Sequence, residues 1–584
     1  MKYPWSTTSS SESLSPDKMP RMPSKTSTDE SSIPSTLEKK STDVRTEILD
    51  APTPEPQFEG THRTLKNRHI QFIGIGGTLG TALFVQIGSS LAKGGPGSLF
   101  LAFTIWSTVI LAVNNCLSEM VTFIPISSPF VRFADRFVDP ALGFASGINF
   151  FIFQTALIPF EITAFNLVLQ FWTDKVPTVV VIIVLLVSYW QVYQTSPLYS
   201  QLINRWVSSV LNMFTSKYYG EAEFWLCLGK VLLAVGVIAF TFVTMCGGNP
   251  LHDAYGFRNW NPDKVPGAPF AEYIKEGNLG RFLGFLACLI QASFTIAGPD
   301  YVAMTAGEAK APRRNLPIAF KSVLYRLTGF FVLGSLAIGI VLPYNDEDLR
   351  NALSSAHPGA GSSPYVIAMR HLNIPVLPHI VNALILTAVF SAGNSYVFCS
   401  SRTLYGLALE GKVPRVFTKC SKGGVPIYSL ALTLSISCIA FLSLSNDAGV
   451  VIQWFVNLVT ASQLLNYGFI SLSYIRFHKA MKAQGIPRDT LPYRTRFQPF
   501  CGYYGLVCTV VMAFVGGYTV FLPGNWNVPN FLFSYAMIGI LPILFIFWKR
   551  KNRTKWQDLS TMTFFEQERM AVDHYEEQLH KKTG

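Results

Sequence analysis

Four ionisable side chains lie inside long apolar segments of this sequence. They are Glu119 in "NNCLSEMVTF", Glu161 in "LIPFEITAFNLVLQFW", Lys230 in "EFWLCLGKVLLAVG" and Asp300 in "SFTIAGPDY". A charge at the centre of a bilayer costs at least a few kcal/mol, so each residue is a candidate for substrate or ion chemistry. Near the end of a helix the same side chain would only reach toward water. That alternative applies most to Glu119 and least to Lys230, which has apolar turns on both sides.

Glycines are concentrated in another apolar stretch, "RHIQFIGIGGTLGTALF", at 68–84. It carries four glycines and two threonines within eight residues, namely Gly74, Gly76, Gly77, Thr78, Gly80 and Thr81. Each glycine lowers helix stability by about 1 kcal/mol relative to alanine. A nucleotide-binding loop does not explain them, because position 79 is Leu79 and no Gly-Lys-Ser/Thr ending follows.

The sixth apolar segment is interrupted as well, in "SFTIAGPDYVAMTAGE", where Gly298-Pro299 falls mid-segment. Proline breaks a helix, and freed backbone groups within a membrane are tolerated only against protein or a cavity. A proline kink with a glycine packing face would explain either segment alone, but explains both at corresponding positions less well. We expect a 5+5 inverted repeat in which two broken helices form a site at the membrane midplane.

The backbone chemistry of two such breaks predicts a ligand. Unwinding around Gly76–Gly80 exposes N–H groups at the start of a half-helix, which attract a carboxylate. Unwinding near Ala297 and Gly298 exposes carbonyls, which accept hydrogen bonds from an ammonium group. A ligand that carries both groups is an amino acid.

Composition agrees with a membrane protein. Of 584 residues 49% are hydrophobic and 14% charged, and mean hydropathy is +0.30, whereas about a quarter of a globular domain is charged. The net charge of +12 does not indicate nucleic acid, because the basic residues lie between apolar blocks. The nine cysteines are scattered, and we expect no metal site, disulfide framework or cofactor.

About 12 apolar segments are long enough to span a bilayer. They lie near 70–92, 97–124, 142–171, 178–213, 222–246, 281–305, 321–343, 375–407, 426–445, 450–475, 503–522 and 530–548. Basic residues favour one set of connecting segments, so we expect that set and both tails to be cytoplasmic. The predicted domains are a disordered N-terminal tail at 1–66, an all-α membrane domain at 67–548 and a C-terminal tail at 549–584. Residues 188–205 lack helical periodicity and are either an insertion or a gene-model artefact.

The chain resembles fungal amino acid permeases of the amino acid–polyamine–organocation superfamily. The resemblance runs from "RTLKNRHIQFIGIGGTLGTALF" to about residue 548, with its strongest motifs there and in "YGEAEFWLCLGKV", "FTIAGPDYVAMTAGEAKAPRRNLP" and "SAGNSYVFCSSRTLYGLA". It implies a LeuT-like fold, a plasma-membrane location and proton-coupled uptake of amino acids.

The resemblance also implies roles for individual residues. The carboxylate-side break would be Gly76, Gly77, Thr78 and Gly80, and the ammonium-side break Phe294, Thr295, Ala297 and Gly298. The remaining residues of the cavity would be Glu161, Ser391 and Asn394. Lys230 would take part in proton coupling, with Glu161, because it matches a lysine that occupies the place of sodium in sodium-coupled relatives.

Other functions receive less support from the sequence. An amino acid sensor with little transport would usually have longer structured extensions. An enzyme would need a nucleophile–base pair or metal ligands within the spans, and the histidines lie mostly in loops or tails. The expected partners are an amino acid, protons and the lipid bilayer. Ubiquitin ligase and trafficking machinery would act at tail lysines, namely Lys18, Lys25, Lys39 and Lys40. The sequence does not specify which amino acid is carried.

Overall fold

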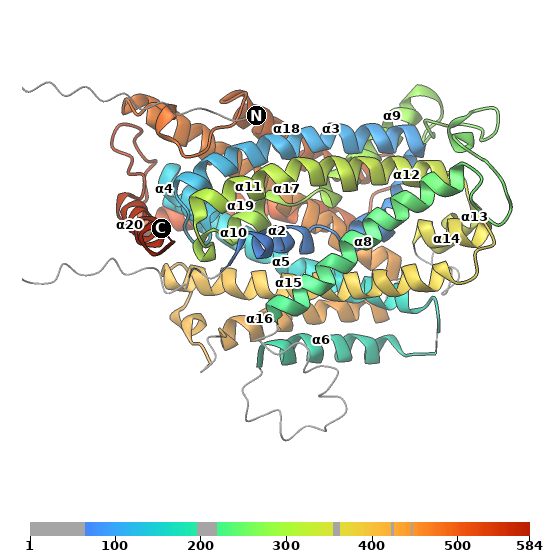
Figure 1. The fold of residues 1–584 in the computed structure, drawn as a ribbon, viewed down its shortest axis with the longest axis horizontal. Helices are drawn as coiled ribbons and strands as arrows, with labels where there is room; N and C mark the ends of the chain where they lie inside the picture. The colour runs from blue at the N-terminus through green and yellow to red at the C-terminus, as the bar shows by residue number, and fades with distance from the viewer. Residues whose placement is uncertain are drawn as a thin grey trace, which may run out of the picture. The chain divides into compact units, whose positions relative to one another are not determined.

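The computed structural model describes residue 63 and residues 65–173, 175–194, 219–353, 363–421, 425–445 and 448–583. These residues form helices joined by turns, with two isolated β-bridges as the only extended pairings among them. The N-terminal tail with its lysines, and residues 195–205 of the doubtful segment, lie outside this part of the chain. The all-α fold that the sequence predicts is therefore confirmed (Figure 1).

The first half of the chain contains eight elements that matter for the site. They are α2 (Asn67–Gly76), the π-helix η1 (Ala82–Gln86), α3 (Ile87–Phe123), α4 (Pro129–Phe137), α5 (Pro140–Leu169), α6 (Thr178–Gln194), α8 (Tyr219–Met245) and α9 (Gly277–Thr295).

The second half of the chain also consists mainly of helices. They are α10 (Pro299–Met304), α11 (Pro312–Arg326), the π-helix η5 (Leu327–Val332), α12 (Leu333–Val341), α13 (Glu347–Leu353), α14 (Pro364–His371), α15 (Leu377–Leu409), α16 (Ile427–Ser437), the 3-10 helix η7 (Cys438–Leu444), α17 (Ala448–Ala483), α18 (Phe500–Val515), α19 (Val528–Asn552) and α20 (Glu566–Thr583).

Nine helical stretches of the described residues are long and apolar enough to cross a membrane, and α6 and α18 are shorter apolar helices. The long helix α3 contains the end of the first span and the whole second span, because it is interrupted at Gly95, which has a φ of 77° and precedes Pro96. A side chain at Gly95 would also meet the backbone of Pro269, which packs against this turn. With the first span made of α2, η1 and the start of α3, these helices correspond to the twelve expected spans.

The helix α6 revises the interpretation of residues 188–205. It continues through Gln194, so the first seven of those residues are helical rather than irregular. Tyr189 is fully buried and stacks on Phe390 of α15 with ring centroids 5.5 Å apart. The described part of the segment therefore belongs to the fourth span.

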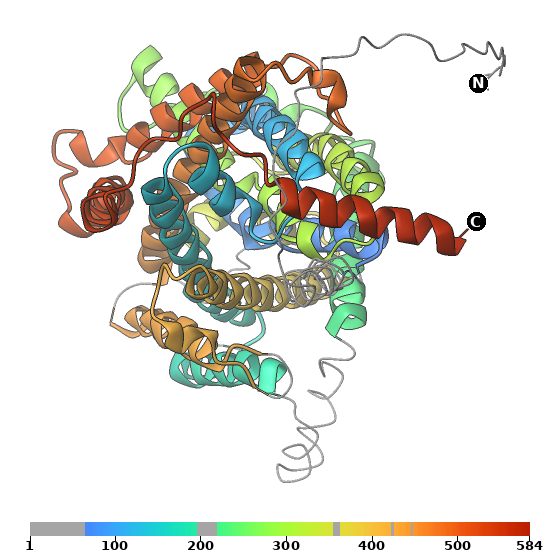
Figure 2. The ribbon, with the colours of Figure 1, turned by 90° about the vertical axis from the view of Figure 1, so that its left-hand side faces the viewer.

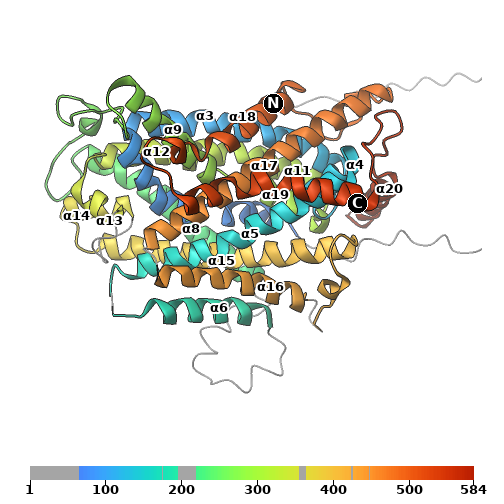
Figure 3. The same cartoon turned by 180° about the vertical axis from the view of Figure 1, so that it is seen from behind.

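Two groups of helices surround the centre of the molecule. The helix α5 packs against α15, α17 and α19, and Figure 3 shows α5, α15, α16 and α6 side by side. On the other side α3 packs against α9, α11, α12 and α18, while α8 crosses α2, α12 and α15. The helix α2 thus contacts both α8 and α11 (Figure 1).

The segment after α19 is folded onto the bundle. Met562, Phe564 and Phe565 are buried in its core. The helix α20, at the front of Figure 2, is held by the ion pairs Arg132–Glu568, at 3.1 Å, and Arg313–Asp573. The end of the chain is therefore tied both to α4 and to the start of α11.

Candidate functional site

The two interrupted helices meet at their breaks. The helix α2 ends at Gly76, and helical structure resumes at Thr81. The helix α9 ends at Thr295 and α10 begins at Pro299, after Gly298 with a φ of 148°. A Cβ on Gly298 would lie 3.4 Å from Thr78 Cγ2. Both predicted breaks are thus present, and they pack against each other.

A cavity lies where the breaks meet, and all but two of its lining residues are buried. It is about 30 Å³, measured as the space open to the centre of a water-sized sphere, which is room for roughly two water molecules. Seven residues predicted from the sequence line it: Gly77, Thr78, Gly80, Glu161, Phe294, Thr295 and Ala297. The other lining residues are Thr81, Ala82, Phe153, Leu157, Phe160, Tyr301, Tyr396, Val459 and Gln463.

Glu161 supplies the carboxylate of the cavity. It is 1% exposed on α5 and accepts a hydrogen bond from the hydroxyl of Thr81. A Cβ on Gly80 would lie 3.4 Å from its Oε1, so the missing side chain leaves room for the carboxylate. Lys230 of α8 is also 1% exposed and lies within electrostatic range of Glu161. The fold therefore brings together the two residues assigned to proton coupling.

Aromatic rings form the apolar wall of the cavity. Phe294 of α9 and Phe160 of α5 pack edge to face, with ring centroids 5.4 Å apart. This pair joins the sixth span to α5 and closes the cavity on one side.

Four of the predicted residues lie beside the cavity rather than on its wall. Gly76 and Gly298 adjoin lining residues at the breaks. Ser391 and Asn394 are buried on α15, whereas Tyr396 of the same helix lines the cavity. Ala392 also faces this side, because its Cβ would lie 3.4 Å from a Cβ on Gly80.

Three polar lining residues escaped sequence analysis. The hydroxyl of Tyr396 donates to the carbonyl of Gly77 at 3.3 Å, and Gln463 Nε2 donates to the carbonyl of Ile296 at 3.4 Å. Tyr301 packs on Gly77, where a Cβ would lie 2.6 Å from Cε1 of its ring. These side chains hold the backbone of both breaks. They come from α10, α15 and α17, so no local spacing marks them as a set.

The other two intramembrane acids have distinct surroundings. Glu119 is fully buried and accepts hydrogen bonds from Tyr474 and Arg488, each at 2.5 Å, and from the backbone of Thr495 at 2.7 Å. It anchors the loop before α18 and neither reaches water nor lines the cavity. Asp300 lies in the first turn of α10 and accepts a hydrogen bond from Tyr467 at 3.3 Å.

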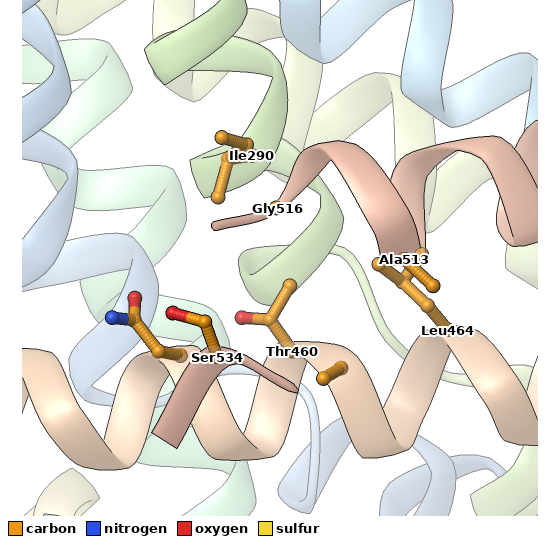
Figure 4. A pocket seen from close by; sticks show the side chains of 8 residues that line it. Ile290, Thr460, Leu464, Ala513, Gly516 and Ser534 are labelled. Carbon is orange, nitrogen blue, oxygen red and sulfur yellow. The ribbon is translucent and has the colours of Figure 1, made fainter. Parts of the chain in front are cut away.

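A second, smaller cavity lies between α9, α17, α18 and α19 (Figure 4). It is about 10 Å³ by the same measure and is lined by residues such as Ile290, Thr460, Leu464 and Ala513, so it has room for at most about one water molecule. None of the residues predicted to bind substrate lines it. It is a packing void.

One group of residues in the described part of the chain has metal-ligand geometry. Asp346, Asp348 and His371 place three ligand-type atoms within 4.8 Å of one another. His371 contacts both carboxylates, at 3.5 Å and 2.9 Å, so pairing between the side chains accounts for the cluster.

The fold and the site define a multi-pass helical membrane protein with a central cavity at two interrupted helices. Residues 69–560 match the amino acid permease family. The general amino acid permease AGP2 of Saccharomyces cerevisiae is 46% identical over 84% of this chain and 80% of its own length. The probable proline-specific permease put4 of Schizosaccharomyces pombe is 40% identical over 82% of each chain.

A solved manganese transporter from Eremococcus coleocola covers 85% of this chain and 98% of its own, with a TM-score of 0.49 and 11% identity. The chain belongs to the amino acid permease family and is a membrane transport protein, not an enzyme.

Proposed function

We propose that this protein imports amino acids across the plasma membrane by proton symport and alternating access, with both termini in the cytoplasm. The observation that carries the proposal is the single cavity shared by both breaks and Glu161.

The breaks present opposite partial charges to a bound amino acid. Helical structure resumes at Thr81, and the first turn of this helix lies at the cavity. The N–H groups of that turn carry the positive end of the helix dipole. They would bind the substrate carboxylate. The helix α9 ends at Thr295, where its last carbonyls carry the negative end. They would bind the substrate ammonium group.

Proton coupling would use Glu161 and Lys230. Both are buried, and a change of charge on either alters the electrostatic interaction between α5 and α8. Because α8 packs against α2, that change would reach the first break. Lys230 would thus connect protonation to the position of α2.

Uptake into vesicles containing the purified chain tests this function. A panel of labelled amino acids is offered with and without an imposed inward proton gradient. We expect accumulation of one class above equilibrium only with the gradient. Binding without accumulation would contradict transport and support a sensor. Equal accumulation with and without the gradient would contradict proton coupling.

The variant Lys230→Met separates coupling from binding. We expect it to bind substrate and to exchange it across the membrane, but not to accumulate it in response to the gradient. Lys230→Arg, which keeps the charge, is the matched control. Accumulation by Lys230→Met at the wild-type level would remove Lys230 from the mechanism.

A further inference from the structure

Arg326, the last residue of α11, is a buried cation without a partner. It is 8% exposed, and among the described residues none of its three guanidinium nitrogens finds a hydrogen-bond acceptor. No ionised group of the described chain compensates its charge. The sequence places it inside an apolar segment, and the π-helix η5 follows directly.

Two other buried charges of the described chain have an ion partner. Glu119 has Arg488, and Asp139 has Lys549. A buried charge with neither an ion pair nor hydrogen bonds is strongly unfavourable, and in membrane segments such residues mark functional sites. Arg326 therefore differs from these two structural ion pairs.

The guanidinium of Arg326 lies against the last turn of α2. A Cβ on Gly74 would be 2.9 Å from its Nη1 and 2.8 Å from Cγ2 of Val302. The helices α2, α10 and α11 thus meet at this point, two residues before α2 ends. Only a glycine at 74 allows this approach.

The C-terminal end of α2 offers the charge weak compensation. Its last turn contains no basic residue, and the negative end of its dipole favours a nearby cation. The carbonyls there are already used, since those of Gly74 and Ile75 accept from the hydroxyl of Thr78. Arg326 is held at α2 by packing and by the dipole, without a hydrogen bond.

We infer that Arg326 is a positioning residue for transport, and this rests on the proposed function. Its uncompensated charge destabilises the conformation in which α2 closes the cavity. Displacement of α2 from α10 and α11 admits water to the guanidinium and removes that penalty. The arginine thereby favours the step that opens the cavity on the side where α2 begins.

The test compares Arg326→Met, which is apolar and of similar length, with Arg326→Lys, which keeps the charge. The thermal midpoint of the purified full-length chain and the kinetics of amino acid uptake are measured for both. We expect Arg326→Met to raise the midpoint and to lower the maximal uptake rate by roughly tenfold, because an apolar side chain relieves the buried charge. The KM should stay within about twofold of wild type, since Arg326 does not line the cavity. Arg326→Lys should retain the wild-type rate.

Three outcomes would overturn the inference. A lower midpoint or failure to fold in Arg326→Met would show that the arginine stabilises this conformation. An unchanged maximal rate would show that its charge does not affect the transport cycle. An equal loss of rate in Arg326→Lys would show that the shape of the guanidinium matters rather than its charge. The comparison of thermal midpoints between wild type and Arg326→Met does not depend on uptake. If the wild-type chain shows no uptake, the proposed function is contradicted, but the midpoints still test whether the buried charge of Arg326 destabilises this conformation.

Discussion

Thr81 donates a hydrogen bond to Glu161, and this bond joins the resumed first span to the middle of α5. Both residues line the central cavity, and both are buried. The bond holds a carboxylate beside backbone that is free to bind substrate. Any change of charge on Glu161 is therefore felt directly at the break.

Replacing Thr81 with valine keeps the shape of the side chain and removes the donor. Loss of the donor leaves an oxygen of the buried Glu161 carboxyl group without its partner, which costs about 1–3 kcal/mol. We expect Thr81→Val to lower uptake kcat/KM by roughly 10- to 100-fold. Thr81→Ser, which retains the hydroxyl, should stay close to wild type. Wild-type kinetics in Thr81→Val would show that the bond has no role in transport.

Gly77 is the position at which the two breaks have least room. A Cβ there would lie 2.6 Å from the ring of Tyr301. Overpacking of this kind costs about 1–3 kcal/mol and would separate the breaks. We expect Gly77→Ala to reduce uptake by about tenfold or more, measured at equal protein in the vesicle membrane. Gly236→Ala is the matched control, since its Cβ would meet no atom within 4 Å, and it should transport normally.

The ion pair between Glu119 and Arg488 stabilises the fold away from the cavity. Arg488→Met leaves a buried carboxylate without its cation, which costs about 3 kcal/mol, the low end of the range because Arg488 is 31% exposed. We expect a lower thermal midpoint with an unchanged KM for uptake. Arg494→Met breaks the exposed pair with Asp489 in the same loop and should change stability by about 1 kcal/mol or less. A changed KM in Arg488→Met would contradict a purely structural role.

Asp139 links the start of α5 to the end of α19. Burial alone raises the pKa of Asp139, but hydrogen bonds from Lys549, Thr554 and the backbone of Ala141, with the charge of Lys549, outweigh burial and hold the pKa below its ordinary value. A carboxyl with a lower pKa in the folded state stabilises the protein above its unfolded pKa of about 4. That stabilisation is lost as the pH falls through the folded-state value.

We therefore expect Asp139→Asn to lower the thermal midpoint near neutral pH and to flatten its fall below about pH 4. Asp263→Asn, at an exposed position in a loop, should keep the wild-type acid profile. Parallel acid profiles for wild type and Asp139→Asn would show that Asp139 does not contribute to the pH dependence of stability.

The sequence by itself determined the all-α membrane fold, the approximate spans and the two breaks. These features follow from local physics, because a run of apolar residues needs about 20 positions to cross a bilayer. Glycine and proline disrupt a helix wherever they stand. Seven lining residues, from Gly77 to Ala297, were predicted for the same reason or by resemblance.

Only the tertiary structure decided which distant side chains complete the cavity. Tyr396 and Gln463 hold the breaks from helices far along the chain, whereas Ser391 and Asn394 lie beside the cavity. The helix α15 is apolar around most of its circumference, so its sequence pattern does not specify which of its sides faces α2. That orientation depends on how the helices pack. Arg326 is visible in the sequence as a charge within an apolar segment. Only the packed structure shows that its guanidinium has no hydrogen-bond acceptor, because that depends on every helix around it.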